Sequence, residues 1–142
     1  MAITRFAEAT WNGDLLSGNG TINYVSSGAF TRLPVTWASR TEEHNGRTSP
    51  EELIAAAHSS CFSMALSSAL AKAGTPPTQL ETSAAVTFQP GEGITGIHIT
   101  VKGTVPDISA EDFVAAAEGA KANCPVSKAL TGTPLTLDAS LA

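Results

Sequence analysis

The 142-residue chain lacks the features that mark nucleic-acid-binding, secreted and disulfide-framework proteins. Eight Lys and Arg face thirteen Asp and Glu, which gives a net charge of −5 with no basic run. This balance argues against a surface that binds nucleic acid or anionic membranes. Two cysteines are too few for a disulfide scaffold. The first residues carry no apolar signal segment, so we expect a cytoplasmic protein whose thiols stay reduced unless they react.

Charged residues are also scarce, at 15% of the chain against 42% apolar residues. The apolar share is ample for the core of one domain, which we predict to span residues 1–142. A surface with so few charges suggests that a partner subunit covers part of it. The apolar stretch 53–73 contains His58, Lys72 and several serines, so it predicts a buried helix of a soluble protein rather than a membrane span.

The N-terminal third of the chain predicts short strands separated by turns. Glycine and asparagine at 11–14 and 18–20 are turn signals. Alternating side chains predict one strand over 21–25 and another over 35–37. The polar segment 41–48 contains Asn-Gly and predicts a loop.

The segment after this loop carries the clearest helix signal. Ser49 is a good N-cap, Pro50 suits the first helical position, and Glu52 completes a capping box. Gly74 is a natural stop, so the helix is predicted over about 50–73. Its residues are apolar on nearly all sides, which predicts a position at the centre of the fold.

The remaining half of the chain predicts further strands and helices. Period-two alternation marks the strands, and Ser109 with Asp112 marks the start of a helix. The predicted elements are strands 83–88 and 97–102 joined at 90–93, helices 109–122 and 125–130, and a final strand 135–141. Strands at both ends with helices between them predict an α+β fold.

The two cysteines are the first candidates for chemistry. Cys61 lies in the middle of the apolar helix, where a cysteine is commonly a small buried filler. Cys124 lies at the start of a short helix, where backbone amides favour a thiolate. If the two meet, one thiol can attack a substrate and the other can resolve the product; their spacing alone leaves this open.

Glu51 is the second candidate, because it can either interact with the helix dipole or hold an arginine. The upstream arginines are Arg32, Arg40 and Arg47. An arginine beside Cys61 would lower the thiol pKa and bind an oxygen substrate. Glu51 precedes Cys61 by about 15 Å of helix. Either the arginine bridges that gap or a partner chain supplies Glu51, so we predict a homodimer with shared sites.

Histidines offer weaker alternatives. His58 lies one turn before Cys61, and its position favours a buried structural histidine over a Cys–His pair for acyl transfer. His98 alternates away from the apolar face of its strand, which predicts a solvated side chain. A zinc site made of His58, Cys61 and Cys124 would lack the short ligand spacing typical of such sites.

Three segments resemble the signatures of the osmotically inducible protein C and organic hydroperoxide resistance (OsmC/Ohr) family. They are Trp11-x-Gly13-Asp14 through Thr21, Ser49–Leu66, and Asn123-Cys124-Pro125-Val126-Ser127. The His-x-x-Cys-Phe-Ser-Met form within the second segment is similar to the OsmC branch. The resemblance implies an intertwined α+β homodimer, with two central helices wrapped by antiparallel sheets from both chains and sites at the subunit interface.

The resemblance also implies a thiol peroxidase acting on organic hydroperoxides, and more weakly on hydrogen peroxide. Cys61 would be the peroxidatic residue and Cys124 the resolving one, with Arg40 as the catalytic arginine and Glu51 as its partner. An external dithiol, such as a dihydrolipoyl group or a lipoylated protein, would reduce the disulfide. Neither a metal nor a bound cofactor is implied.

A different function is possible on the same fold, namely a non-catalytic, stress-related binding protein with inert cysteines. Such a protein would be expected to lose at least one of the four site residues. Cys61, Cys124, Arg40 and Glu51 are all present, and this favours the enzyme.

Overall fold

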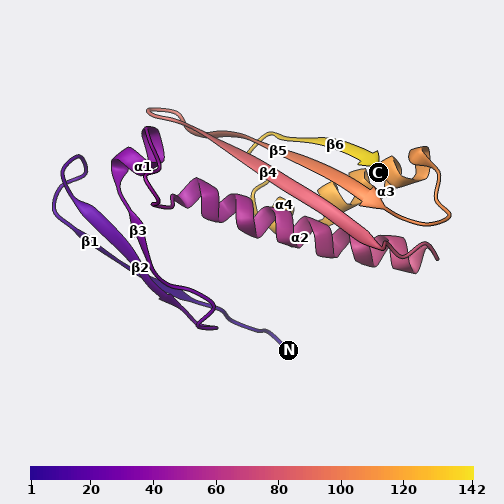
Figure 1. Ribbon diagram of the computed structural model, residues 1–142, viewed down its shortest axis with the longest axis horizontal. Helices are drawn as coiled ribbons and strands as arrows, with labels where there is room; N and C mark the ends of the chain where they lie inside the picture. Colours follow the sequence, from indigo (N-terminus) through magenta and orange to yellow (C-terminus); the bar gives the residue numbers. More distant parts are fainter. The chain divides into compact units, whose positions relative to one another are not determined.

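The computed structural model describes residues 1–142, which form two compact units, Met1–Leu53 and Ile54–Ala142 (Figure 1). Helices and strands are mixed along the chain, which confirms the predicted α+β class. The elements are β1 (Ala7–Asn12), β2 (Asn19–Val25), β3 (Thr31–Val35), α1 (Trp37–Thr41), α2 (Pro50–Lys72), β4 (Gln79–Gln89), β5 (Gly93–Thr104), α3 (Ala110–Asn123), α4 (Pro125–Ala129) and β6 (Leu135–Leu141).

The first unit contains an antiparallel sheet in the order β1-β2-β3. Trp11 and Gly20 face each other across β1 and β2, and a Cβ on Gly20 would lie 2.6 Å from the indole ring. Only glycine therefore leaves room for Trp11 here. The indole Nε1 donates to the carbonyl oxygen of Gly13, 3.0 Å away, and Gly13 has a φ of 87°. These contacts give the tryptophan-glycine motif a structural role in closing the hairpin.

Two of the predicted elements in this unit are wrong. Asn19 and Gly20 belong to β2 rather than to a turn, and the strand predicted over 35–37 ends at Val35. Trp37 begins α1, because Thr36 and Ser39 form a reciprocal capping box in which each backbone N–H donates to the other's hydroxyl at 3.0 Å. This cap outweighs the strand preference of the aromatic and β-branched side chains.

Helix α2 begins in the first unit and continues through the second, within one residue of its predicted end. The backbone N–H of Glu52 donates to the Ser49 hydroxyl at 3.2 Å, as expected for an N-cap. The Glu52 carboxylate accepts a hydrogen bond from the Thr48 hydroxyl at 3.0 Å. The capping box is therefore only half formed, and Glu52 instead ties the preceding loop to the helix.

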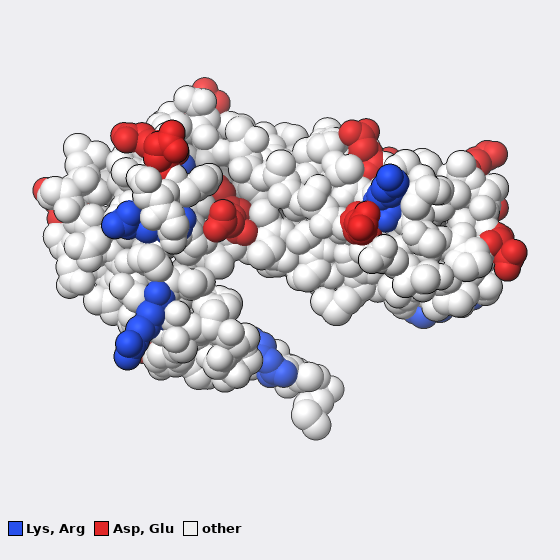
Figure 2. All heavy atoms as spheres, in the orientation of Figure 1, with Lys and Arg blue, Asp and Glu red and all other residues white.

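Within one chain, only one side of α2 is covered. His58, Phe62, Leu66 and Leu70 recur every four residues and are buried. Met64 on another side is 68% exposed, so within the single chain the predicted burial of this helix is confirmed on one side only. By length and composition alone, α2 is also apolar enough to cross a membrane, a test that core helices pass too. Uncharged residues cover most of the face drawn in Figure 2.

The second unit contains the sheet β4-β5-β6 with β5 in the centre, antiparallel to β4 and parallel to β6. Its strands match the predicted positions, although β4 and β5 are longer. Ile97, Ile99 and Val101 of β5 point into a core shared with α2 and α3. Gly103 lies against the Phe113 ring, and a Cβ there would meet the ring at 2.5 Å.

The parallel pairing of β5 with β6 requires a crossover connection, which α3 and α4 provide. Helix α3 begins where predicted, with the Ser109 hydroxyl accepting from the backbone N–H of Asp112 at 3.1 Å. Cys124 joins α3 to α4 and is fully buried in the core. The topology therefore places the second cysteine inside the fold, on the crossover.

Candidate active site

Cys61 and Cys124 lie together in the second unit. Cys61 is partly buried on α2 and packs against the core cluster that includes Cys124. Both are free thiols, and each affects the pKa of the other through hydrogen bonding between their side chains. The structure thus answers the question left open by the sequence spacing, because the fold brings the two thiols close enough for each to shift the pKa of the other.

The pKa values of the two thiols are shifted in opposite directions. Burial raises the pKa of Cys61, and its hydrogen bond to Cys124 raises it further. Burial would also raise the pKa of Cys124, but hydrogen bonds from Cys61 and from the backbone and hydroxyl of Ser127 outweigh it and lower the pKa. In this environment Cys124 therefore ionises more readily than Cys61.

A buried histidine is bound to the same cysteine-bearing segment. His58 Nε2 lies 2.7 Å from the Ser127 hydroxyl oxygen, and both side chains are buried. The other ring nitrogen, Nδ1, is buried without a partner. Burial also lowers the pKa of His58, which favours a neutral imidazole. The predicted burial of His58 is confirmed. Cys61, Cys124, His58 and Ser127 are referred to below as the thiol cluster.

Ser127 was not among the residues singled out from the sequence. A serine near the start of a short helix is common and carries no chemical signal by itself. Its spacing is the only available hint, because it follows Cys124 by three residues just as Cys61 follows His58 by three. Spacing of this kind becomes informative only once the fold joins the two helices.

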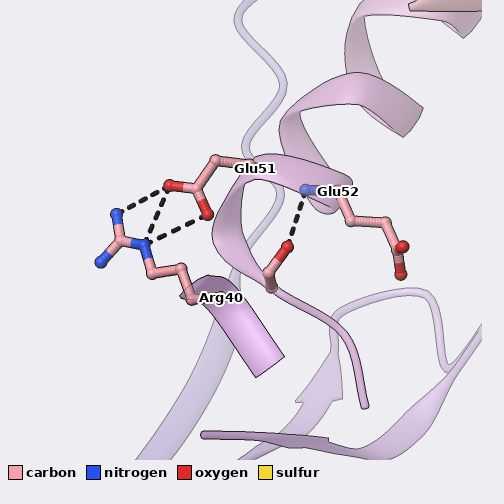
Figure 3. Close-up of polar contacts among 4 residues, drawn as sticks. Arg40, Glu51 and Glu52 are labelled. Carbon is pink, nitrogen blue, oxygen red and sulfur yellow. Dashed lines mark hydrogen bonds and ion pairs between the residues drawn. The ribbon is translucent and has the colours of Figure 1, made fainter. Parts of the chain in front are cut away.

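In the first unit, Glu51 holds Arg40 (Figure 3). Arg40 Nη2 donates to Glu51 Oε1 at 2.8 Å, and Arg40 Nε donates to Oε1 and Oε2 at 3.0 and 3.1 Å. The guanidinium carbon also lies 5.9 Å from the Trp37 ring centroid. Among the three candidate arginines, the ion pair is formed by Arg40. Arg40, Glu51 and Trp37 are referred to below as the ionic cluster.

Each unit has a hollow beside its cluster. The hollow in the first unit has a volume of about 350 Å³, and its lining is mostly apolar with one cation. The lining residues are Trp11, Leu15, Val35, Thr36, Trp37, Arg40 and Pro50. The hollow in the second unit has a volume of about 180 Å³ and adjoins His58 and Ser127. The first suits a small molecule with an apolar body and a polar end.

The remaining histidine predictions concern the surface and metal binding. The His98 side chain is 42% exposed, and it lies 2.6 Å from the Thr136 hydroxyl and 3.1 Å from an Asp138 carboxylate oxygen. It is thus partly solvated, as predicted, and also bound to the neighbouring strand. No group of three or more His, Cys, Asp or Glu side chains is placed to hold a metal ion.

Comparisons with known proteins agree over nearly the whole chain. The family model for OsmC-like proteins matches residues 43–138. The chain is 42% identical to the peroxiredoxin OsmC of Escherichia coli and to that of Shigella flexneri, over 99% of each chain. An organic hydroperoxide resistance protein OsmC from Legionella pneumophila has a similar structure, with a TM-score of 0.71, 20% identity and 99% coverage of both chains. One from Elizabethkingia anophelis gives a TM-score of 0.72, 22% identity and 100% coverage of both chains. The two solved structures show the same fold.

Proposed function

This chain belongs to the OsmC-like protein family, and from that premise we propose that it is a cysteine-based peroxidase. Its substrates would be organic hydroperoxides, and it would act through a disulfide between Cys61 and Cys124. The names of its relatives support a peroxidase-type redox role. The observation that carries the proposal is the contact between two free thiols from distant parts of the chain.

The proposed cycle balances with these two thiols and an external dithiol. The Cys61 thiolate attacks the distal oxygen of the hydroperoxide, the O–O bond breaks, and the alcohol leaves, so that Cys61 becomes a sulfenic acid. Cys124 then attacks the Cys61 sulfur, the S–O bond breaks, and water leaves. A dithiol, for which we propose a dihydrolipoyl group or a lipoylated protein, reduces the resulting disulfide by exchange.

In this proposal, Arg40 supplies the positive charge that stabilises the Cys61 thiolate at the subunit interface. Burial raises the pKa of Cys61, so a cation is needed to favour the attacking thiolate. We assign this role to the Arg40 guanidinium, with Glu51 as the residue that orients it. The apolar hollow that Arg40 lines supports a preference for organic hydroperoxides over hydrogen peroxide.

The proposal includes a cytoplasmic homodimer of single-domain chains with its sites at the subunit interface. The exposed side of α2 supports this arrangement, because an apolar helix with Met64 exposed is more stable when a second copy covers it. Sedimentation of the wild type and of Met64→Glu tests it. A stable wild-type monomer with full activity would contradict the shared site.

The peroxidase proposal is tested by titrating the thiols before and after one equivalent of cumene hydroperoxide, together with the intact mass. The expected result is the loss of both thiols and of about two hydrogens, as for one new disulfide. Two thiols that stay free would overturn the proposal and favour the non-catalytic binding protein.

A further inference from the structure

The hydrogen bond between His58 and Ser127 has a regular place relative to the two cysteines. His58 precedes Cys61 by three residues on α2, and Ser127 follows Cys124 by three residues at α4. Residues three apart on a helix lie about one turn from each other. The 2.7 Å contact therefore joins the two cysteine-bearing elements one turn away from each sulfur atom.

The unpartnered Nδ1 of His58 indicates which ring nitrogen carries the hydrogen. If Nδ1 carried the hydrogen, a buried N–H donor would lack an acceptor, which is rarer and costlier than an unused acceptor. We therefore assign the hydrogen to Nε2, which donates to the Ser127 oxygen. The single hydroxyl hydrogen of Ser127 is then available to a second acceptor.

The second acceptor next to Ser127 is the sulfur of Cys124. Hydrogen bonding by the Ser127 hydroxyl is one of the causes that lower the pKa of Cys124. The opposite tautomer would direct the Ser127 hydrogen toward His58 and leave the sulfur without it. Both side chains are buried, which limits the competition from water for this hydrogen.

Resting on the proposed function, we propose that His58 and Ser127 form a hydrogen-bond chain that positions Cys124 and stabilises its thiolate for the resolving step. In that step the Cys124 S–H bond and the Cys61 S–O bond break, and the disulfide bond forms. The proton from Cys124 leaves with the hydroxyl group of the sulfenic acid as water. Ser127 donates to the thiolate as it forms, and His58 donates to Ser127, so both are positioning residues.

The first test measures how fast the disulfide forms in full-length Ser127→Ala after one equivalent of cumene hydroperoxide. Losing a hydrogen bond to the charged sulfur lowers the thiolate fraction of Cys124 about tenfold. The remaining thiolate is more basic and therefore about threefold more nucleophilic, which offsets part of this loss. We expect disulfide formation to slow at least about threefold, with more sulfenic acid trapped by dimedone. Ser63→Ala is the matched control, because the Ser63 hydroxyl bonds Thr82 at 2.7 Å and does not serve either cysteine.

The second test separates this role from simple packing. Thiolate absorbance in a Cys61→Ala background reports the pKa of Cys124, which we expect to rise on adding Ser127→Ala or His58→Leu. His58→Gln keeps an N–H near the position of Nε2, so it should restore the lower pKa in this background and the faster disulfide formation in the protein that retains Cys61. Equal values of the Cys124 pKa and of the rate of disulfide formation in all variants would overturn the proposed hydrogen-bond chain. The same conclusion would follow if His58→Gln behaved like His58→Leu.

The two proposals fail in distinguishable ways. If wild-type protein forms no disulfide with cumene hydroperoxide, the peroxidase function itself is wrong. If the wild type forms the disulfide and Ser127→Ala forms it equally fast, only the positioning chain is wrong.

Discussion

The ionic cluster and the thiol cluster stabilise their polar atoms in opposite ways. In the ionic cluster, a full charge meets a full charge through three N–H···O contacts, and Arg40 remains 30% exposed to water. In the thiol cluster, every side chain but Cys61 is fully or almost fully buried, burial lowers the pKa of the imidazole and so favours its neutral form, and one ring nitrogen has no partner.

If the proposed function is right, this contrast assigns the charged and the buried part of the thiol chemistry to different clusters. Charge is kept where water and a matched carboxylate stabilise it. The buried site avoids charge and directs its hydrogen bonds to one sulfur, that of Cys124. The attacking thiolate of Cys61 would then depend on the ionic cluster, whereas the resolving thiol would depend only on its own surroundings.

The largest effect should come from removing each sulfur in turn. Cys61→Ser should abolish hydroperoxide consumption in a dithiol-coupled assay, because no attacking sulfur remains. Cys124→Ser should consume one equivalent and then oxidise further, because its sulfenic acid has no resolving thiol. Since Cys124 has the lower pKa, the opposite result is informative: an inactive Cys124→Ser beside an active Cys61→Ser would reverse the assigned roles.

The next largest effect should come from breaking the ionic cluster, and the two partners should differ. Arg40→Gln leaves a carboxylate that is only 8% exposed without its cation, so we expect a loss of about 2 kcal/mol in the free energy of unfolding. Glu51→Gln leaves a guanidinium that water can reach, and should cost about half as much.

Urea unfolding measures both losses, and peroxidase assays should show at least a tenfold decrease for Arg40→Gln. A conservative Arg40→Lys variant keeps the charge but loses the paired donor geometry, and should give intermediate values. Equal stability losses for Arg40→Gln and Glu51→Gln would contradict the difference in exposure as their cause.

A packing change in the second unit sharpens the comparison, because it should lower stability without touching either cluster. A Cβ at Gly103 would meet the Phe113 ring at 2.5 Å, so Gly103→Ala should cost about 1 to 2 kcal/mol in unfolding free energy. Disulfide formation at 25 °C should match the wild type. Slow disulfide formation in this variant would mean that general destabilisation, rather than lost hydrogen bonds, explains the thiol-cluster variants.

The smallest effect is a pH dependence that only the thiol cluster should show. Burial lowers the pKa of His58 in the folded state below the 6.5 of a free histidine, so the unfolded chain binds more protons as the pH falls through that value. Stability should therefore decrease below about pH 6.5, by at most about 1.4 kcal/mol per pH unit. Urea unfolding at pH 7 and pH 5 should show a smaller loss for His58→Gln than for the wild type. Equal losses would exclude His58 as the cause.

The sequence predicts those parts of the fold that local chemistry controls. Helices α2 and α3 start at capping serines, Ser49 and Ser109, and the alternation of β6 is clear without knowledge of its neighbours. The strand predicted at Trp37 is wrong because a Thr-x-x-Ser cap is a weaker signal in the sequence than an aromatic residue in an alternating pattern. The exposed side of α2 could not be predicted from periodicity, because its small apolar residues look alike on every side.

The candidate site is also predictable only in part from the sequence. Cys61, Cys124 and Glu51 stand out individually, but the contact between the cysteines depends on the crossover through α3 and α4. The choice of Arg40 over Arg47 follows from the end of α1, an element absent from the sequence prediction. Ser127 lies in the second cysteine motif, but its role becomes visible only once α4 is brought against His58.

The position of β6 at the edge of its sheet has a consequence for exchange dynamics. β6 is hydrogen-bonded to one neighbour, β5, and it closes the crossover that carries Cys124. Edge segments of this kind open locally at a lower free energy than the central strands. A Cys61–Cys124 disulfide would tie the crossover to α2. The amide protons of α4 and β6 should therefore exchange with solvent more slowly in the oxidised protein. Local opening would be greatest in the reduced form, which is the form that begins the next turnover.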